Sequence, residues 1–337
     1  MTTWDHGAHH DQEEEQVQVP ICDLRPFRLP MRRRFRGTTE RQGVLLRGPA
    51  GWGEFSPFPE YGPAYAARWL LAAQEAASEP FPPPRRAWVP VNVTVPAVDA
   101  ATAHRLVRES GCATAKVKVA EPGQDLADDV ERVAAVRDAL GPDGAVRVDA
   151  NAAWDVETAV LAIARLDVAA HGLEYVEQPC RTLAELGEVR RRVTVPLAAD
   201  ESVRTADDPL RIAGLDAADV VVVKVQPLGG VRRALEVIDA AGLPVVVSSA
   251  LESSVGLAAG VALAAALEHL PHACGLGTAA MFVGDVTPTP LTPVGGQVEV
   301  RRVEPDAALL DQQAPDPDTA DELLTRMGLA AAELEGR

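Results

Sequence analysis

Lysine is rare in this chain, and its few occurrences lie within apolar segments. Of the 32 basic residues only Lys116, Lys118 and Lys224 are lysine, and all the others are arginine. Each lysine lies inside a short apolar run that is typical of a buried strand. Lysine can act as a general base once its pKa falls, whereas arginine stays protonated in proteins. The choice of lysine at these positions therefore indicates proton-transfer chemistry.

Acidic side chains occur at the ends of neighbouring apolar runs. Asp149, Glu177 and Asp200 each close such a run. A single Asp at a strand end usually caps a helix. If the runs are parallel strands of one sheet, however, three buried carboxylates converge and need a cation to neutralise them. An all-oxygen ligand set without His or Cys favours Mg²⁺, for which Mn²⁺ can substitute.

Carboxylates around Mg²⁺ with lysines on either side are suited to removing a proton alpha to a carboxylate. We expect repulsion between Lys116 and Lys118, together with the nearby dication, to lower their pKa values toward neutrality. The metal and the cationic side chains would stabilise the developing enediolate. A purely structural charge network is the alternative interpretation.

These residues need a scaffold that brings strand ends together. Eight apolar runs recur at intervals of roughly 25 residues, with amphipathic helices predicted between them, for example over 125–140, 156–166 and 231–241. This pattern predicts an α/β fold, a modified TIM barrel of (β/α)7β-like form. A doubly wound sheet is the alternative, but no glycine-rich phosphate-binding turn follows an early strand. The runs are 88–95, 115–119, 145–150, 173–177, 197–200, 220–225, 244–248 and 273–277.

The two ends of the chain lack the regular alternation of apolar runs and helices that is predicted for the middle. Residues 1–87 comprise a polar tail, irregular strands, a helix predicted at 65–78 and a proline-rich stretch that marks a boundary. Residues 88–282 would form the catalytic barrel. Residues 283–337 contain a short predicted strand at 297–303 and a helix at 319–333. We expect this last segment to return to the N-terminal region, so that both chain ends form an α+β capping domain.

Composition excludes several classes of partner. The net charge of −17 disfavours nucleic acids and anionic membranes. The longest apolar stretch, Val255–Leu267, is too short to cross a bilayer, and the acidic N-terminus lacks the apolar region of a secretory signal. These features predict a cytoplasmic protein that acts on a small-molecule carboxylate, and they leave the oligomeric state open, with a monomer one possibility. The four cysteines, Cys22, Cys112, Cys180 and Cys274, have no paired spacing, which indicates reduced thiols. The tail histidines His6, His9 and His10 are not expected to bind metal.

The motifs resemble, in order and spacing, those of the enolase superfamily, in its muconate-lactonizing subgroup. Three further features are similar to the o-succinylbenzoate synthase family of menaquinone biosynthesis: residues 51–58, Arg147-x-Asp149, and residues 248–256 followed by 275–278. The low-lysine composition resembles its actinobacterial members. The resemblance covers about residues 20–300. The motifs that carry it are Lys116-x-Lys118, Asp149-x-Asn151, Glu177-Gln-Pro, Asp200-Glu-Ser and Lys224.

This resemblance implies dehydration of 2-succinyl-6-hydroxy-2,4-cyclohexadiene-1-carboxylate to 2-succinylbenzoate. Lys118 would remove the alpha proton and return it to the leaving hydroxide on the same face. Lys224 would stabilise the enediolate from the opposite face, and Lys116 would tune Lys118. The implied Mg²⁺ ligands are Asp149, Glu177 and Asp200.

The resemblance also implies which residues contact the substrate. Arg147 and Asn151 would orient the site, and Ser248, Ser249 and Gly277 would hold the succinyl arm. Residues 35–61 would form a flexible loop over the substrate. The family pattern does not explain the neighbouring arginines Arg32, Arg33, Arg34 and Arg36.

Two other functions remain open at this stage. An N-succinyl or N-acylamino-acid racemase, or a dipeptide epimerase, would use Lys118 and Lys224 as opposed acid and base. Many dipeptide epimerases carry an Asp-x-Asp near strand eight, whereas residues 274–279 contain no carboxylate. A catalytically silent binding or scaffold barrel is a more distant alternative.

Overall fold

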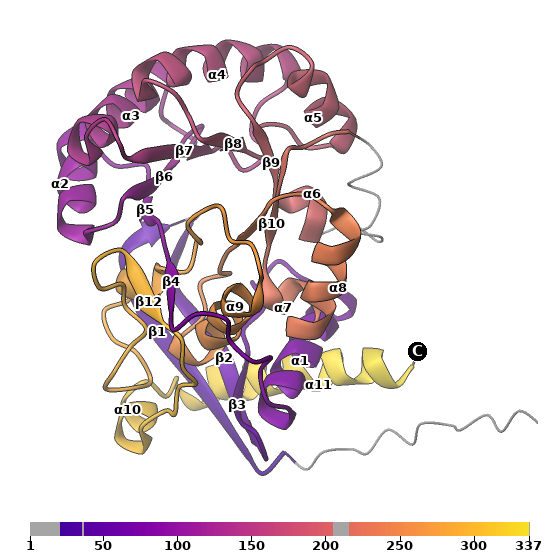
Figure 1. Cartoon of the computed structure of the whole chain (residues 1–337). Coiled ribbons are helices and arrows are strands. Elements are labelled where there is room, and N and C mark those ends of the chain that lie inside the picture. Colours follow the sequence, from indigo (N-terminus) through magenta and orange to yellow (C-terminus); the bar gives the residue numbers. More distant parts are fainter. Residues whose placement is uncertain (1–20, 36, 205–215, 337) are drawn as a thin grey trace, which may run out of the picture.

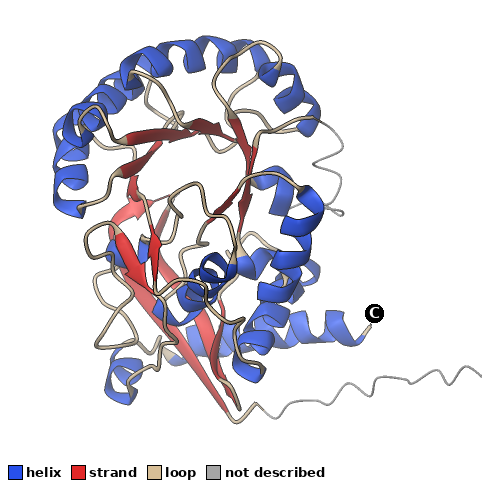
Figure 2. Ribbon diagram, in the orientation of Figure 1, coloured by secondary structure: helices blue, strands red, loops and turns tan. Residues whose placement is uncertain are grey.

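The computed structural model describes residues 21–35, 37–204 and 216–336, so the tail histidines and Arg36 lie outside the described residues. Seven short parallel strands form a curled sheet in the order β11-β10-β9-β8-β7-β6-β5, with helices on its outer side (Figure 1; Figure 2). The strands are β5 Val93–Val95, β6 Thr114–Lys118, β7 Ala145–Asp149, β8 Tyr175–Glu177, β9 Leu197–Ala199, β10 Val220–Val223 and β11 Val245–Val247.

The last predicted run, 273–277, closes the barrel through two isolated bridges instead of a full strand. Cys274 pairs with Val91, and Gly275 pairs with Ser248, both in parallel. Glycine is required at 275 because a Cβ there would lie 2.4 Å from Ser248 Oγ. The (β/α)7β-like barrel is therefore confirmed, with a closing segment shorter than predicted.

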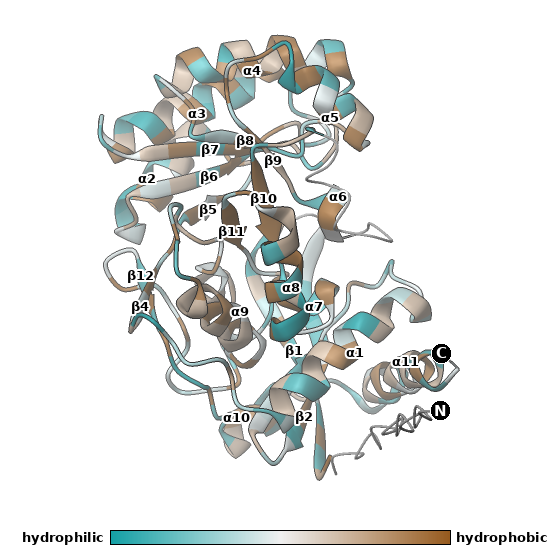
Figure 3. Cartoon of the chain, turned by 45° about the vertical axis from the view of Figure 1, so that its right-hand side comes forward, coloured by the Kyte–Doolittle hydropathy of each residue, from teal (hydrophilic) through white to brown (hydrophobic). Residues whose placement is uncertain are grey.

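The strands and helices of the barrel follow directly from local sequence. The strands are rich in Val and Ala, most of their residues are buried, and Figure 3 shows the apolar character of β10. Asp99, Asp125, Asp155 and Thr182 cap helices by accepting backbone N–H groups of the first turn. The helices are α2 Ala100–Ser110, α3 Leu126–Leu140, α4 Val156–Ala170, α5 Leu183–Arg190, α6 Glu201–Arg204, α7 Val225–Leu228, α8 Val231–Ala241 and α9 Ser254–Ala266, followed by the 3₁₀ turn η3 Thr278–Met281.

The predicted strand over 88–95 is two strands with different partners. Residues Trp88–Pro90 form β4, which pairs antiparallel with β12, Gln297–Glu299, while β5 joins the barrel sheet. The strand predicted at 297–303 is therefore shorter than expected and pairs with the entry to the barrel. Its partner was missed because an apolar run does not show where a strand changes sheets.

The capping part contains an antiparallel sheet with helices packed on it. Strands β1 Asp23–Phe35, β2 Thr38–Gly48 and β3 Gly51–Phe55 form the sheet. Helix α1, Pro63–Ser78, packs on β3, and the C-terminal helix α11, Pro317–Glu335, packs on α1 after the short α10, Ala307–Gln312. Gly53 allows the close approach of α1, because a Cβ there would lie 1.9 Å from the Ala73 carbonyl oxygen. The domain boundaries at 87 and 282 remain predictions.

One sequence expectation for this region differs from the structure. Residues 51–55 form β3, which pairs in regular register with β2. The flexible loop expected over 35–61 is for most of its length this β2–β3 hairpin. The segment after Phe55 lies outside the ladder, while Phe35 pairs with Thr38 at the end of β1; Phe35 and Phe58 reach the barrel.

Helix α9 joins the capping part to the barrel. It is buried almost all round and contacts β3, β4 and β11 (Figure 1). Glu54 of β3 accepts the backbone N–H groups of Ser253 and Gly256 at the start of this helix. No helix among the described residues is both long enough and apolar enough to cross a membrane.

Candidate active site

The chemistry-bearing residues meet at the carboxyl ends of the barrel strands. Lys116 and Lys118 belong to β6, Asp149 ends β7 and Glu177 ends β8. In the strand register Lys118 pairs with Asp149, and Asp149 with Glu177, so these side chains lie on the same interior face. Asp200 directly follows β9 and Lys224 directly follows β10. The sequence-predicted convergence is present in the structure.

Four lysine–carboxylate pairs organise the centre. Lys118 Nζ donates to Asp149 Oδ2 at 2.5 Å, and Lys224 Nζ donates to Asp200 Oδ2 at 2.5 Å. Lys116 Nζ lies 2.8 Å from both Glu177 carboxylate oxygens and 3.3 Å from Asp149 Oδ2. All these side chains are buried, so the charges interact in a medium of low dielectric.

The carboxylates around Lys116 govern its electrostatics. Burial alone would lower the pKa of Lys116, but the Glu177 and Asp149 carboxylates raise it above its ordinary value. The lowered pKa expected beside a bound dication stays a prediction. Burial, with the nearby charge of Asp149, raises the pKa of Glu177 to about 7.

The donor atoms decide whether these residues suit a metal ion. Three carboxylates on successive strands supply only oxygen ligands, which fits a hard divalent cation. Among the described residues, no three acidic, His or Cys side chains are already grouped as a metal site. Lysine ammonium groups contact each of the three carboxylates instead. The three carboxylates supply suitable oxygen ligands from adjacent strand ends, so they fit a divalent cation. To bind it, they would replace their contacts with the lysines by contacts with the metal.

A small cavity of about 30 Å³ lies over this centre. Ser248 and Ser249 line it from the end of β11, as predicted from their position after the strand. Phe35 and Phe58 reach it from the capping part, and Lys118 Nζ lies 5.3 Å from the centre of the Phe35 ring. The other lining residues are Thr94, Lys116, Lys118, Asp149, Asp200, Lys224, Ala250, Leu251, Gly275 and Thr278.

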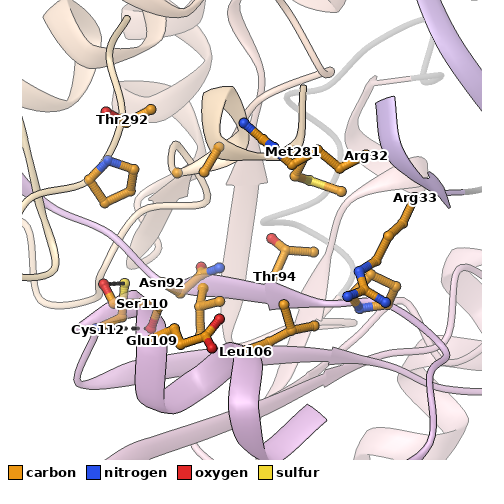
Figure 4. Close-up of a pocket in the computed structure, with 15 residues that line it drawn as sticks. Arg32, Arg33, Asn92, Thr94, Leu106, Glu109, Ser110, Cys112, Met281 and Thr292 are labelled. Atoms are coloured by element: carbon orange, nitrogen blue, oxygen red, sulfur yellow. Dashed lines mark hydrogen bonds between the residues drawn. The ribbon is translucent and has the colours of Figure 1, made fainter. Parts of the chain in front are cut away.

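A larger cavity of about 280 Å³ lies beside the first and shares Thr94 with it (Figure 4). Arg32 and Arg33 line it from the end of β1, and Gly277 lies in its wall. It is lined by none of the converging lysines or carboxylates, so its greater size does not make it the candidate reaction centre. Gly277, predicted to hold substrate, thus faces this neighbouring space.

Arg147 does not occupy the place predicted for it. The residue is fully buried, its Nε lies 2.5 Å from Glu174 Oε2, and its NH1 group donates to the carbonyl oxygen of Ala273. Glu174 and Ala273 lie at the amino ends of their strands, so Arg147 points into the barrel beneath the catalytic layer. The expected substrate contact by Arg147 is therefore wrong in this structure.

Asn151 lies beside the centre and contacts a catalytic lysine. Its side-chain oxygen accepts from Lys118 Nζ at 2.6 Å, and its amide donates to Glu201 Oε1 at 3.2 Å. Its backbone has a φ of 46°, in the left-handed region that Asn tolerates better than most residues. Asn151 therefore orients Lys118, and it does not line the cavity as the structure stands.

The sequence did not single out the walls of the cavity. Phe35, Phe58 and Leu251 come from three distant segments, and apolar residues outside a periodic pattern give no signal of a site. Of these three residues, Leu251 has a left-handed backbone with a φ of 63°, which a sequence does not reveal. Thr94 lies within β5, and Thr278 begins η3 directly after the predicted run 273–277, so its place after a run was the available signal.

Comparison with known families covers most of the chain. Residues 27–77 match the family described as enolase N-terminal domain-like, and residues 99–306 match the enolase C-terminal domain-like family. An o-succinylbenzoate synthase of Thermobifida fusca is 62% identical over 293 residues, which are 87% of this chain and 92% of that protein. An o-succinylbenzoate synthase of Mycobacterium bovis is 55% identical over 290 residues, 86% and 87% of the respective chains.

Solved structures show the same fold at low sequence identity. The N-succinyl Arg/Lys racemase of Bacillus cereus has a TM-score of 0.74 at 21% identity, covering 86% of this chain and 96% of that one. The muconate lactonizing enzyme of Pseudomonas putida has a TM-score of 0.72 at 19% identity, covering 87% and 98%. Members of this superfamily generally use a divalent metal ion, which agrees with the donor set described above. The chain therefore belongs to the enolase superfamily and, within it, to the o-succinylbenzoate synthase family.

Proposed function

We propose that this chain is an o-succinylbenzoate synthase, a hydro-lyase that converts 2-succinyl-6-hydroxy-2,4-cyclohexadiene-1-carboxylate to 2-succinylbenzoate in menaquinone biosynthesis. The observation that carries the proposal is the 62% identity to a synthase over most of both chains. The convergence of three lysines and three carboxylates in one buried centre supports the same chemistry. The substrate is a small-molecule carboxylate, in agreement with the size of the two adjoining cavities.

In this proposal the carboxylates hold the cofactor. Asp149, Glu177 and Asp200 would bind Mg²⁺, or Mn²⁺ in its place, because they are the acidic side chains at the ends of β7, β8 and β9. The bound cation would supply charge stabilisation for the enediolate oxygens. It would also relieve the repulsion between the carboxylates that favours a protonated Glu177.

Lys118 is the proposed acid and base of the reaction. Its Nζ, in its neutral form, accepts the alpha proton from the substrate carbon. The C–O bond on the same face then breaks, its electron pair leaves with the hydroxide, and Lys118 returns the proton to give water. Asn151 and Asp149 orient the amine through contacts of 2.6 Å and 2.5 Å. Lys116 adjusts the charge around Lys118 through its own contact with Asp149.

Lys224 is the proposed electrostatic partner. It follows β10, across the barrel mouth from β6, and its buried ammonium group lies next to Asp200. There it stabilises the negative charge that develops on the enediolate. Ser248 and Ser249 would bind the succinyl arm, whereas Gly277 would contact only a portion that extends into the neighbouring cavity.

Racemisation of N-succinyl amino acids is the second candidate. The presence of a lysine on each side of the mouth, and the shared fold with an N-succinyl Arg/Lys racemase, favour it. In that reaction Lys118 and Lys224 would each exchange the alpha proton of one enantiomer.

The decisive assay follows loss of the absorbance of the cyclohexadiene substrate with and without Mg²⁺. The proposal predicts rapid loss with Mg²⁺ and none with chelator. Deuterium exchange into both enantiomers of an N-succinyl amino acid serves as the comparison. Strong exchange of both enantiomers alongside negligible dehydration would overturn the synthase assignment in favour of the racemase.

A further inference from the structure

One wall of the catalytic cavity comes from a segment without regular secondary structure. Residues 56–61, here called the Phe58 segment, follow β3 and precede α1. Phe58 is 7% exposed and lines the cavity opposite the strand ends, together with Leu251. Because the segment lies outside the sheet ladder, its backbone groups need other partners to fix their position.

Arg41 of β2 connects three parts of this wall. It is 2% exposed, and its Nε donates to the carbonyl oxygen of Leu251 at 3.1 Å. Its NH2 group donates to the carbonyl oxygen of Ser56. The guanidinium carbon lies 4.1 Å from the centre of the Phe58 ring, within the range of a cation–π contact. A single buried side chain thus contacts the aromatic ring and both backbone segments beside it.

A second arginine holds the Phe58 segment from its outer side. Arg326 of α11 donates to the carbonyl oxygens of Pro57, at 3.0 Å, and Tyr61, at 2.9 Å, and also to that of Phe58. Ser56 is further tied to the barrel, because its N–H donates to Gln226 Oε1 at 3.3 Å. Gln226 lies two residues after Lys224. The segment is therefore linked both to the C-terminal helix and to the strand end that carries a catalytic lysine.

We propose that Arg41 and Arg326 are positioning residues that hold Phe58 against the bound substrate. The inference rests on the proposed synthase function for the identity of that substrate. A guanidinium fork can donate to two carbonyl oxygens while stacking on an aromatic ring, whereas a lysine ammonium cannot match this planar geometry. Neither arginine touches the lysines or carboxylates of the reaction centre, so both act through the wall and not on the reacting atoms.

The test compares Arg41→Lys with Arg137→Lys in the full-length enzyme. Arg137 is also buried and donates to backbone carbonyl oxygens, those of Ala170 and Gly144, but at the amino ends of the strands. In this proposal Phe58 contacts the substrate but not the bonds that change, so its displacement should raise KM more than it lowers kcat. We expect Arg41→Lys to raise KM on the order of tenfold with kcat within about threefold of wild type. Arg326→Lys should shift KM in the same direction, and Arg137→Lys should leave KM unchanged.

Hydrogen exchange provides a readout that does not depend on turnover. Amides of the Phe58 segment should exchange faster in Arg41→Lys and Arg326→Lys than in wild type or Arg137→Lys. If Arg41→Lys does not fold, the half-buried Arg326→Lys gives the same comparison.

The outcomes separate the two proposals. Synthase activity in wild type, with equal KM in Arg41→Lys, Arg326→Lys and Arg137→Lys, would overturn the positioning role and leave the function intact. A second outcome would refute the function and support the positioning role. In it, wild type has no synthase activity, and hydrogen exchange is faster only in the Phe58 segment of the Arg41 and Arg326 variants.

Discussion

Replacing Lys224 tests both the charge and the shape of the reaction centre. Lys224 Nζ lies 2.5 Å from Asp200 Oδ2, and the two side chains are 6% and 1% exposed. Removing one partner of a buried ion pair typically costs about 3–5 kcal/mol, because the other charge remains in the interior. We expect Lys224→Ala to lower the free energy of unfolding by about this amount in chelator. Mg²⁺ should restore part of the loss by binding the folded state.

The same substitution should have a separate effect on rate. Loss of one preorganised electrostatic contact typically costs on the order of a hundredfold to a thousandfold in kcat, or about 3–4 kcal/mol. Lys224→Arg retains the positive charge but adds a planar fork to a small cavity of about 30 Å³. It should therefore keep measurable activity, well below wild type and well above Lys224→Ala.

The assay is loss of cyclohexadiene absorbance under saturating Mg²⁺, together with denaturant unfolding in chelator and in Mg²⁺. Arg233→Ala is the control, since it removes a 2.6 Å ion pair with Glu236 on the exposed face of α8. An exposed pair contributes at most about 1 kcal/mol, so this variant should match wild type closely. Equal turnover by Lys224→Ala and wild type, or Lys224→Arg no better than Lys224→Ala, would refute the electrostatic role.

Asp200→Asn should abolish turnover while the protein stays folded by circular dichroism, and chelator-treated wild type should regain activity with Mg²⁺ or Mn²⁺; full activity in excess chelator would disprove metal dependence. Gly53→Ala should lower the free energy of unfolding by more than about 3 kcal/mol, since its Cβ would lie 1.9 Å from a backbone oxygen of α1. Gly328→Ala, with no atom within 4 Å of its Cβ, should instead stabilise α11 by up to about 1 kcal/mol. Burial raises the pKa of Glu54 to about 7. Protonated Glu54 therefore stabilises the folded state, fully so below its ordinary pKa, and this stabilisation is lost as pH rises through about 7. The free energy of unfolding, measured with denaturant, should fall by up to about 3 kcal/mol over this range. Glu54→Gln should show a smaller fall.

The barrel could be predicted because its strands are buried on both faces and repeat at the interval of one βα unit. The helix over 231–241 matches α8 residue for residue for the same reason, since its apolar positions follow helical periodicity. The division of 88–95 into β4 and β5 could not be predicted in this way. β4 pairs with β12, which lies far away in the sequence, and a local sequence pattern does not indicate such a long-range pairing.

The reaction centre was predictable because alternation along a strand fixes which face a side chain occupies. Alternation does not fix depth along the barrel axis, so it could not show that Arg147 lies one layer below Asp149. The wall residues Phe35 and Phe58 belong to the capping part, and only the tertiary fold brings them over the strand ends. The pKa of Lys116 depends on contacts with Glu177 and Asp149 that no sequence spacing specifies.

The central claim is that Lys118 alone performs both proton transfers of a dehydration on one face of the substrate. Turnover of the cyclohexadiene by Lys118→Ala, measured beside wild type in saturating Mg²⁺, tests it most directly. The predicted result is rapid loss of absorbance with wild type and no loss above the enzyme-free rate with Lys118→Ala. Turnover by Lys118→Ala near the wild-type rate would contradict the claim.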